Sequence, residues 1–160
     1  MIQGLHHTSF TVSNVAEAER FFIEIFGMKR IGGGRYDFDY IRRQVGYPDA
    51  VLHISVLSFP TTEGLHVGAH LLELIEYQTP RQTAVDTSTC RPGAAHMAFV
   101  VDDIHAEFDR LQSKGIQFKS SPNEVTFGIN RGAWAVYFNG PDMIALELIQ
   151  PARPGTETKK

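Results

Sequence analysis

The sequence predicts an α+β protein made of two tandem βαβββ modules, which form a half-open, cup-shaped sheet with the helices outside. Two pairs of similar segments indicate this duplication. Residues 5–15 resemble residues 94–104 at a constant offset of 89 residues, and both segments read as a strand followed by a helix start. Residues 72–75 and 146–149 both read Leu-Glu-Leu-Ile, at an offset of 74 residues. Each half therefore opens and closes with a strand of the same kind.

The first half begins with a strand and an amphipathic helix. Leu5–Val12 alternates apolar and polar residues, which is typical of a strand with one buried face. Asn14 followed by Glu17 predicts a helix start of the capping-box type, and Gly27 predicts its end. The apolar residues between them recur at helical spacing and predict the inward face: Val15, Ala18, Phe22 and Ile25.

The segment Arg30–Pro48 is less regular. Gly32–Gly34 predicts a flexible hinge or loop. Phe38, Ile41 and Val45 recur at spacings of three and four residues, which predicts a short helix that ends before Pro48. Two strands follow at Val51–Phe59 and His70–Tyr77, with a hairpin-type turn at Pro60–Gly64.

The second half repeats the plan. A strand is predicted at Ala95–Val101, and Asp102 or Asp103 caps a helix that ends at Gly115. The inward residues of that helix are predicted as Ile104, Phe108 and Leu111. The remaining prediction is a short strand at Ile116–Lys119, a loop from Pro122 to Arg131, and a final hairpin of Ala133–Phe138 and Met143–Ile149 around Asn139–Asp142.

The predicted organisation is a single domain over residues 1–160. The halves cover about residues 4–77 and 94–151, with a linker over about 78–93 and a flexible tail over 152–160. The two offsets differ by 15 residues, an excess in the first half that we expect mostly between Arg30 and Pro48.

Composition excludes several classes of function. A net charge of −3 with scattered basic residues argues against a nucleic-acid or membrane partner. No stretch approaches the roughly 20 apolar residues of a membrane-spanning helix. Residues 1–20 lack the pattern of a signal peptide, and the single Cys90 excludes an intrachain disulfide framework. We therefore expect a cytoplasmic protein.

Four residues stand out because the repeat places the same residue type at the same position twice. These are His7 and His96 in the opening strands, and Glu73 and Glu147 in the closing strands. Strand alternation places all four opposite the helix-packing residues, so that they can point into a shared cup. Two imidazoles and two carboxylates suit one divalent ion per chain, with Zn²⁺, Fe²⁺, Mn²⁺, Co²⁺ and Ni²⁺ all left open. His6 is left out because its counterpart is Ala95.

This duplicated pattern resembles the vicinal oxygen chelate superfamily, which includes glyoxalase I, methylmalonyl-CoA epimerase, extradiol dioxygenases and the fosfomycin and bleomycin resistance proteins. The resemblance spans about residues 4–151, and its most specific parts are His7–Val12, Leu72–Ile75, His96–Asp103 and Pro141–Asp142 with Leu146–Leu148. The resemblance implies that the four residues above are metal ligands. It also implies bidentate chelation of a small substrate with adjacent oxygens, metal stabilisation of an enediolate or similar oxyanion, and a homodimer.

The reaction within this superfamily is left open between four alternatives. A lyase or isomerase is favoured, with an epimerase slightly ahead of a glyoxalase I-like lactoylglutathione lyase, and Glu147 or Glu73 would be the general base. An Fe(II) extradiol-type dioxygenase needs two histidines and one carboxylate, so the fourth ligand disfavours it. A non-enzymatic protein that sequesters a ligand is the remaining alternative.

Substrate recognition is predicted at two places. Arg35 and Tyr40 belong to the irregular segment of the first half, where a short helix could cover the cup. Asn130 and Arg131 precede a strand that enters the cup and suit an anionic or hydroxylated substrate.

Overall fold

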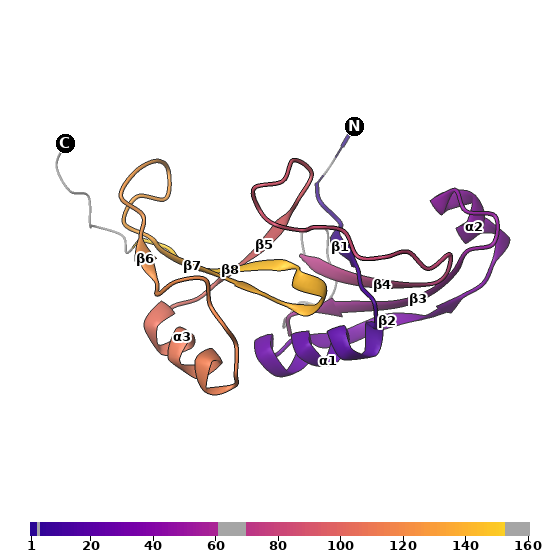
Figure 1. The fold of residues 1–160 in the computed structure, drawn as a ribbon. Helices are drawn as coiled ribbons and strands as arrows, with labels where there is room; N and C mark the ends of the chain where they lie inside the picture. The colour runs from indigo at the N-terminus through magenta and orange to yellow at the C-terminus, as the bar shows by residue number, and fades with distance from the viewer. Residues whose placement is uncertain (3, 61–69, 153–160) are drawn as a thin grey trace. The chain divides into compact units, whose positions relative to one another are not determined.

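The computed structural model describes residues 1–2, 4–60 and 70–152, which group into two compact units. Unit 1 spans Met1–Val85 and unit 2 spans Asp86–Lys160. Each unit contains its own sheet and its own helix on that sheet (Figure 1). The α+β class with two βαβββ modules is confirmed, whereas the single domain and its boundaries stay a prediction.

Unit 1 forms a four-stranded sheet in the order β1-β4-β3-β2. β1 runs parallel to β4, and the other neighbours are antiparallel. The elements in chain order are β1 (His7–Thr11), α1 (Val15–Phe26), β2 (Lys29–Tyr36), α2 (Asp39–Val45), β3 (Val51–Ser58) and β4 (Leu71–Thr79). The turn predicted at Pro60–Gly64 lies, from Thr61 onward, outside the described residues.

Helix α1 begins and ends where the sequence predicts. The Asn14 side-chain oxygen accepts hydrogen bonds from the backbone N–H groups of Ala16 and Glu17, at 3.0 and 3.2 Å. Gly27 ends the helix in the left-handed conformation, with φ 68°. All four predicted inward residues of α1 are buried, and the helix packs against β3 and β4. One face of the sheet is therefore closed by α1.

Strand β2 corrects the predicted hinge or loop at Gly32–Gly34. These glycines lie inside the strand and pair with β3, after a register shift between Arg30 and Gly32. Gly33 has φ +112°, and a Cβ atom there would lie 2.1 Å from the Ile54 carbonyl oxygen. The glycine is therefore required by the close approach of two backbones, which the sequence alone does not distinguish from flexibility.

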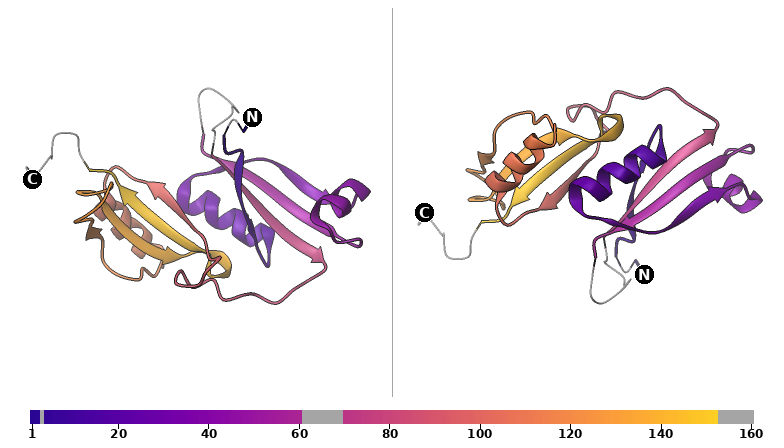
Figure 2. Two further views of the ribbon diagram at one scale, coloured as in Figure 1. Left: turned by 90° about the horizontal axis from the view of Figure 1, so that it is seen from above. Right: turned by 90° about the horizontal axis from the view of Figure 1, so that it is seen from below.

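Helix α2 confirms the predicted short helix and packs on the sheet face opposite α1. Its buried Ile41 contacts Leu52 and Ile54 of β3, and this cluster also includes Val45 and Tyr77. Leu52 and Ile54 alternate with residues that face α1, which places α2 on the other side (Figure 2). One end of the second face is thus covered by apolar side chains.

Unit 2 forms a second four-stranded sheet in the order β5-β8-β7-β6, with β5 parallel to β8. Its elements are β5 (His96–Val100), α3 (Ile104–Ser113), β6 (Asn123–Glu124), β7 (Trp134–Asn139), the 3₁₀ turn η1 (Pro141–Met143) and β8 (Ala145–Gln150). Asp103 caps α3 by accepting from the N–H groups of His105 and Ala106. Ile104 and Leu111 are buried, as predicted, and Phe108 is half-buried.

The edge of the second sheet differs from the prediction. The strand expected at Ile116–Lys119 is a single bridge between Phe118 and Phe138, and β6 lies in the stretch predicted as a loop. The Phe118 ring lies 4.5 Å from the Phe108 ring and 5.1 Å from the Phe138 ring, centroid to centroid. Side-chain packing under α3, more than a strand ladder, therefore holds this segment.

The extra residues of the first half lie in two places. Val56 pairs with Glu73, and Tyr137 pairs with Glu147, so Val56 and Tyr137 are equivalent at an offset of 81 residues. Eight of the 15 extra residues therefore precede Val56, and seven lie between β3 and β4. At most eight of the 15 can therefore lie between Arg30 and Pro48, and the other seven form a second insertion between β3 and β4.

None of the helices in the described residues is long and apolar enough to cross a membrane.

Candidate metal centre

In unit 1, His7 and Glu73 face each other on the sheet face that α1 does not cover. Their neighbours Leu72 and Leu74 are buried on the α1 side, so alternation along β4 directs Glu73 to the other face. His7 Nε2 lies 3.6 Å from Glu73 Oε2, and the two side chains are 40% and 22% exposed. The His6 ring contacts His7, with 2.9 Å between the two Nδ1 atoms, which leaves His7 Nε2 directed at the carboxylate.

Unit 2 repeats this arrangement with His96 and Glu147. His96 Nε2 lies 3.3 Å from Glu147 Oε2, and the side chains are 46% and 11% exposed. Leu146 and Leu148 are buried beside Glu147, as their counterparts are in unit 1. Each unit thus presents one imidazole nitrogen and one carboxylate oxygen at an equivalent position.

The donor atoms of each pair fit a divalent metal ion in type and in spacing. Metal bonds of about 2.0–2.2 Å to nitrogen and oxygen separate neighbouring ligands by about 3.0–3.4 Å. The separations of 3.6 and 3.3 Å within the pairs are close to that range. Each pair supplies two donors, and in residues 1–2, 4–60 and 70–152 no group of three or more such side chains is assembled. The four-ligand site stays a prediction.

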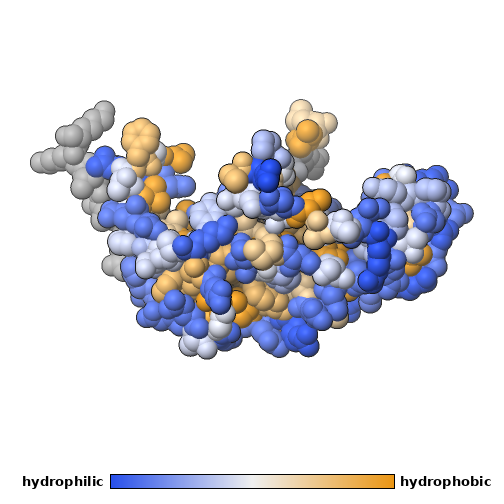
Figure 3. Space-filling view, in the orientation of Figure 1, coloured by the Kyte–Doolittle hydropathy of each residue, from blue (hydrophilic) through white to orange (hydrophobic). Residues whose placement is uncertain are grey.

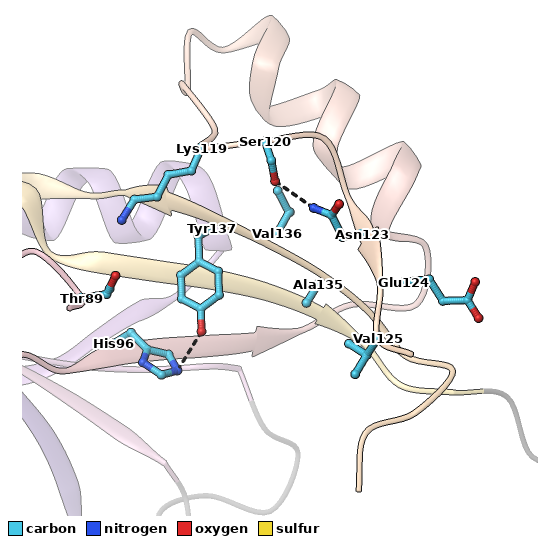
Figure 4. Close-up of a pocket in the computed structure, with 10 residues that line it drawn as sticks. All are labelled: Thr89, His96, Lys119, Ser120, Asn123, Glu124, Val125, Ala135, Val136 and Tyr137. Carbon is cyan, nitrogen blue, oxygen red and sulfur yellow. Dashed lines mark hydrogen bonds between the residues drawn. The ribbon is translucent and has the colours of Figure 1, made fainter. Parts of the chain in front are cut away.

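Tyr137 is a site residue that the sequence reasoning missed. Its hydroxyl lies 3.3 Å from His96 Nε2 (Figure 4). The same hydroxyl donates a hydrogen bond to the Glu147 carboxylate. Burial, this hydrogen bond and the charge of Glu147 raise the pKa of Tyr137 to about 12. The predicted hairpin at Asn139–Asp142 does not supply this contact, because counting back from it would place Tyr137 opposite Ile144. In the structure the connection extends through η1 to Ile144, and the register pairs Tyr137 with Glu147.

A pocket of about 500 Å³ lies beside His96 and Tyr137 in unit 2. Its other polar lining residues come from the sheet edge and the preceding loop: Thr89, Lys119, Ser120, Asn123 and Glu124. The Lys119 backbone N–H donates to the Tyr137 carbonyl at 2.8 Å, which places Lys119 next to Tyr137 at the edge of the sheet. Figure 4 shows the Glu124 carboxylate directed away from His96. The pocket therefore offers several hydrogen-bonding groups beside the pair.

The predicted substrate-binding residues of unit 1 occupy other surroundings. Arg35 lies on β2 and pairs with Asp37, at 2.9 Å between Nη2 and Oδ2. Tyr40 lies on α2, is 51% exposed and stacks on Phe38. Neither side chain contacts His7 or Glu73.

Asn130 and Arg131 lie in the exposed loop between β6 and β7 and do not line the pocket. Hydrophobic side chains project from the surface at this loop (Figure 3), where Phe127 and Ile129 are almost fully exposed. The use of Asn130 and Arg131 in substrate recognition stays a prediction.

Glu76 and Gln150 share a structural position that explains why they recur at the same place. The Glu76 carboxylate accepts the N–H of Val15 at 3.0 Å, and the Gln150 amide oxygen accepts the N–H of Ile104 at 2.8 Å. Both residues thus satisfy the first N–H of a helix. The repeated strand therefore carries a candidate ligand on one face and a helix cap on the other.

The chain belongs to the Glyoxalase/Bleomycin resistance protein/Dioxygenase superfamily, because the model of that family matches residues 4–148. The resemblance seen in the sequence is confirmed. Among individual proteins, the chain is 29% identical over 151 residues to a 2-epi-5-epi-valiolone epimerase of an Actinomyces species, covering 91% of the chain and 78% of that protein. It is also 29% identical over 170 residues to glyoxalase I of Saccharomyces cerevisiae, covering 98% of the chain but 47% of that enzyme.

Solved structures show the same fold. A glyoxalase family protein from Bacillus cereus superposes with a TM-score of 0.74 at 22% identity, covering 96% of this chain and 97% of that one. A glyoxalase/bleomycin resistance protein/dioxygenase domain from a Frankia species superposes with a TM-score of 0.65 at 24% identity, covering 94% and 99%.

Proposed function

We propose that this chain is a divalent-metal-dependent epimerase that abstracts the α-proton next to a chelated carbonyl of a small substrate. The single observation that carries the proposal is the pair of equivalent His–Glu contacts, His7–Glu73 and His96–Glu147. The relative named as an epimerase supports this choice within the superfamily.

The four side chains of the two pairs would hold one divalent metal ion per chain. The His7–Glu73 pair of unit 1 and the His96–Glu147 pair of unit 2 would hold the same ion. The two pairs would belong either to one chain or to the two chains of the predicted homodimer. When bound, the ion supplies Lewis-acid polarisation of the substrate carbonyl, which makes the α-proton more acidic. The metal identity stays open, and the cytoplasmic location stays a prediction.

The protein groups then have to bind the substrate and move one proton. A carboxylate of the pair set, Glu73 or Glu147, accepts the α-proton as general base. Return of a proton to the other face of the same carbon inverts its configuration, with no net oxidation or reduction. The hydrogen-bonding groups of the unit 2 pocket, such as Lys119 and Asn123, suit a small substrate rich in oxygen atoms.

A glyoxalase I-like lyase is the second candidate, supported by the 29% identity to the yeast enzyme. It uses the same proton abstraction on a thiohemiacetal of glutathione. The chain spans about half of that relative, so the assignment of its activity rests on the shared proton-transfer step. An extradiol-type dioxygenase needs only two histidines and one carboxylate, and a sequestering protein needs no catalytic metal site. Neither alternative therefore requires all four donors.

The test is solvent deuterium exchange followed by proton NMR. Purified protein reconstituted with Zn²⁺, Mn²⁺, Co²⁺ or Ni²⁺ is incubated in D₂O with hydroxyacetone, a small ketone with an adjacent hydroxyl group. We expect metal-dependent exchange of the α-protons without glutathione. Turnover only of the methylglyoxal–glutathione thiohemiacetal would favour the glyoxalase instead. Loss of both activities with every metal would overturn the proposed function.

A further inference from the structure

We propose that Lys119 makes the site selective for an anionic substrate, a small hydroxy ketone that carries a carboxylate or phosphate group. The Lys119 ammonium binds that group while the hydroxyl and carbonyl oxygens lie at the His–Glu pairs. The proposal rests on the proposed function and narrows its substrate class. Its support comes from the position of Lys119 in the unit 2 pocket and from the hydrogen bonds of the polar residues beside it.

Strand alternation places the Lys119 side chain on the open face of the unit 2 sheet. Phe118 bridges to Phe138, and their rings pack together under α3. Lys119 and Tyr137 are the next residues along these two segments, so their side chains lie on the opposite face. Both side chains line one pocket together with His96 (Figure 4). The lysine therefore shares a face with the metal-binding pair of unit 2.

Lys119 is the cation of this pocket. Among the described residues that line it there is no other lysine and no arginine. The acidic lining residue, Glu124, directs its carboxylate away from His96 (Figure 4). Within residues 1–2, 4–60 and 70–152, no ion pair holds the Lys119 ammonium. An ammonium group without a compensating carboxylate in a concave site favours a ligand with a negative charge.

The polar side chains next to Lys119 use their hydrogen-bond donors on neighbouring groups. The Ser120 hydroxyl donates to the Ser121 carbonyl at 2.8 Å. The Asn123 side-chain nitrogen donates to the Ser120 hydroxyl oxygen at 2.9 Å and to the Ser121 carbonyl at 2.7 Å. Because serine has one O–H and the asparagine side chain two N–H groups, both now offer a ligand acceptor oxygens. Of Lys119, Ser120 and Asn123, the lysine is therefore the residue whose side-chain donors can bind an anion.

Unit 1 has no side chain at the equivalent position. Tyr137 corresponds to Val56, and the β2 residue that pairs with Val56 is Gly32. A Cβ atom at Gly32 would meet nothing within 4 Å, so open space takes the place that Lys119 fills in unit 2. The repeat thus gives two equivalent His–Glu pairs, with a lysine in the row beside one and a glycine in the row beside the other. A substrate at the pairs therefore has its charged end on the unit 2 side.

The chemistry of the pocket fits carboxylate and phosphate alike. A lysine ammonium is a compact point charge with three donors and imposes no planar geometry on its anion. The acceptor oxygens of Ser120 and Asn123 suit hydroxyl groups of the same molecule. The pocket volume of about 500 Å³ lies within the range of about 300–1,000 Å³ for small-ligand sites. The substrate class is therefore an oxygen-rich hydroxy ketone with one anionic group.

The experiment compares hydroxy ketones that share the HOCH₂–CO group: neutral hydroxyacetone, dihydroxyacetone phosphate, and 5-hydroxy-4-oxopentanoate, which carries a carboxylate. Solvent deuterium exchange with metal-reconstituted protein gives kcat and KM for each ketone. Calorimetry with metal-free protein gives binding without any reaction. The variants are Lys119→Gln and Lys119→Arg. Lys114→Gln is the matched control, because it removes the same charge from an exposed lysine that does not line the pocket.

We expect the wild type to exchange at least one of the anionic ketones with kcat/KM about tenfold or more above that of hydroxyacetone. Lys119→Gln should lower this preference about tenfold to a hundredfold, mainly through KM, the range expected when a hydrogen bond to a charged group is lost. It should weaken calorimetric binding of the anionic ketone by a similar factor. Lys119→Arg should keep most of the preference, and Lys114→Gln should match the wild type. The preferred ketone identifies the anion as carboxylate or phosphate.

The proposal is overturned if the wild type prefers neither anionic ketone, or if Lys119→Gln keeps the wild-type preference. It is also overturned if Lys119→Gln and Lys114→Gln lower the preference equally, since net charge alone would then explain the effect. The proposed function fails separately, if no ketone exchanges with any metal. Binding of an anionic ketone to metal-free protein that depends on Lys119 would in that case still support the anion site.

Discussion

The two units share the same backbone plan and the same His–Glu pair, and they differ in the side chains around that pair. In both, a capped helix covers one sheet face, and a histidine from the first strand meets a glutamate from the last strand on the other. The cross-strand row through the glutamate differs between them. In unit 1 the row is Ser9, Glu73, Val56 and Gly32. In unit 2 it is Ala98, Glu147 and Tyr137, with Lys119 bonded to the Tyr137 backbone.

The difference shows which parts of a duplicated fold set position and which set chemistry. Helix caps and ligand pairs are equivalent in both units because they depend on the backbone plan. The neighbouring side chains do not: unit 1 has valine, glycine and the apolar cluster under α2, whereas unit 2 has a phenol and an open polar pocket. The same glutamate can therefore be loosely held in one unit and tightly held in the other.

The largest expected effect is on the edge strand of unit 1, which has eight residues where β6 of unit 2 has two. Gly33→Ala should lower the free energy of unfolding by about 3 kcal/mol or more, because the new methyl group meets the Ile54 carbonyl and φ is positive. Gly32→Ala is the control, since a Cβ there meets open space and φ is ordinary. Denaturant titration of both variants measures the difference, and equal losses would remove the close-approach explanation.

A smaller and equal effect is expected at the two helix caps. Asn14→Ala and Asp103→Ala should each cost about 1 kcal/mol of stability, because each side chain satisfies two backbone N–H groups of its helix. Gln112→Ala, an exposed position on α3, should change stability little. Denaturant midpoints give the comparison. A loss of stability in only one of the two variants would mean that the two helix caps are not equivalent, although their hydrogen bonds are.

The smallest expected effect is spectroscopic and concerns the two tyrosines whose pKa values the glutamates raise. Burial and Glu147 raise the pKa of Tyr137 to about 12, so in metal-free protein its absorbance change should come last in an alkaline titration and vanish in Tyr137→Phe. Burial, Tyr47 and Glu73 also raise the pKa of Tyr77. A raised phenol pKa stabilises the fold below about pH 10 and ceases to do so as pH rises through the folded-state pKa. Ordinary titration of Tyr137 would contradict its bond to Glu147.

The helix ends and the orientation of the strand residues could be predicted from the sequence, because each depends on neighbouring residues alone. Asn14 and Gly27 mark the ends of α1 through hydrogen bonding and backbone conformation, which neighbouring residues alone determine. The alternation in Leu72–Ile75 places Glu73 opposite the core for the same reason. The duplicated segments then extend these local predictions to unit 2.

The parts that the sequence did not predict depend on contacts between distant segments. Gly33 lies in a strand because it fits against Ile54, a contact that glycine composition does not reveal. Phe118 belongs to a ring cluster under α3 and contributes only one bridge to the sheet. The position of Tyr137 opposite Glu147 follows from strand register, which the longer connection through η1 sets and the predicted hairpin does not give.

The central claim is that one pair from each kind of unit holds a single metal ion. The direct test is the metal content of purified, reconstituted protein by elemental analysis, for the wild type, Glu73→Ala and His96→Ala, with His105→Ala as a control on an exposed histidine. The account predicts about one divalent ion per chain in the wild type and the control, and its loss in both Glu73→Ala and His96→Ala. Metal retained in either of these variants, or absent from every sample, would contradict it.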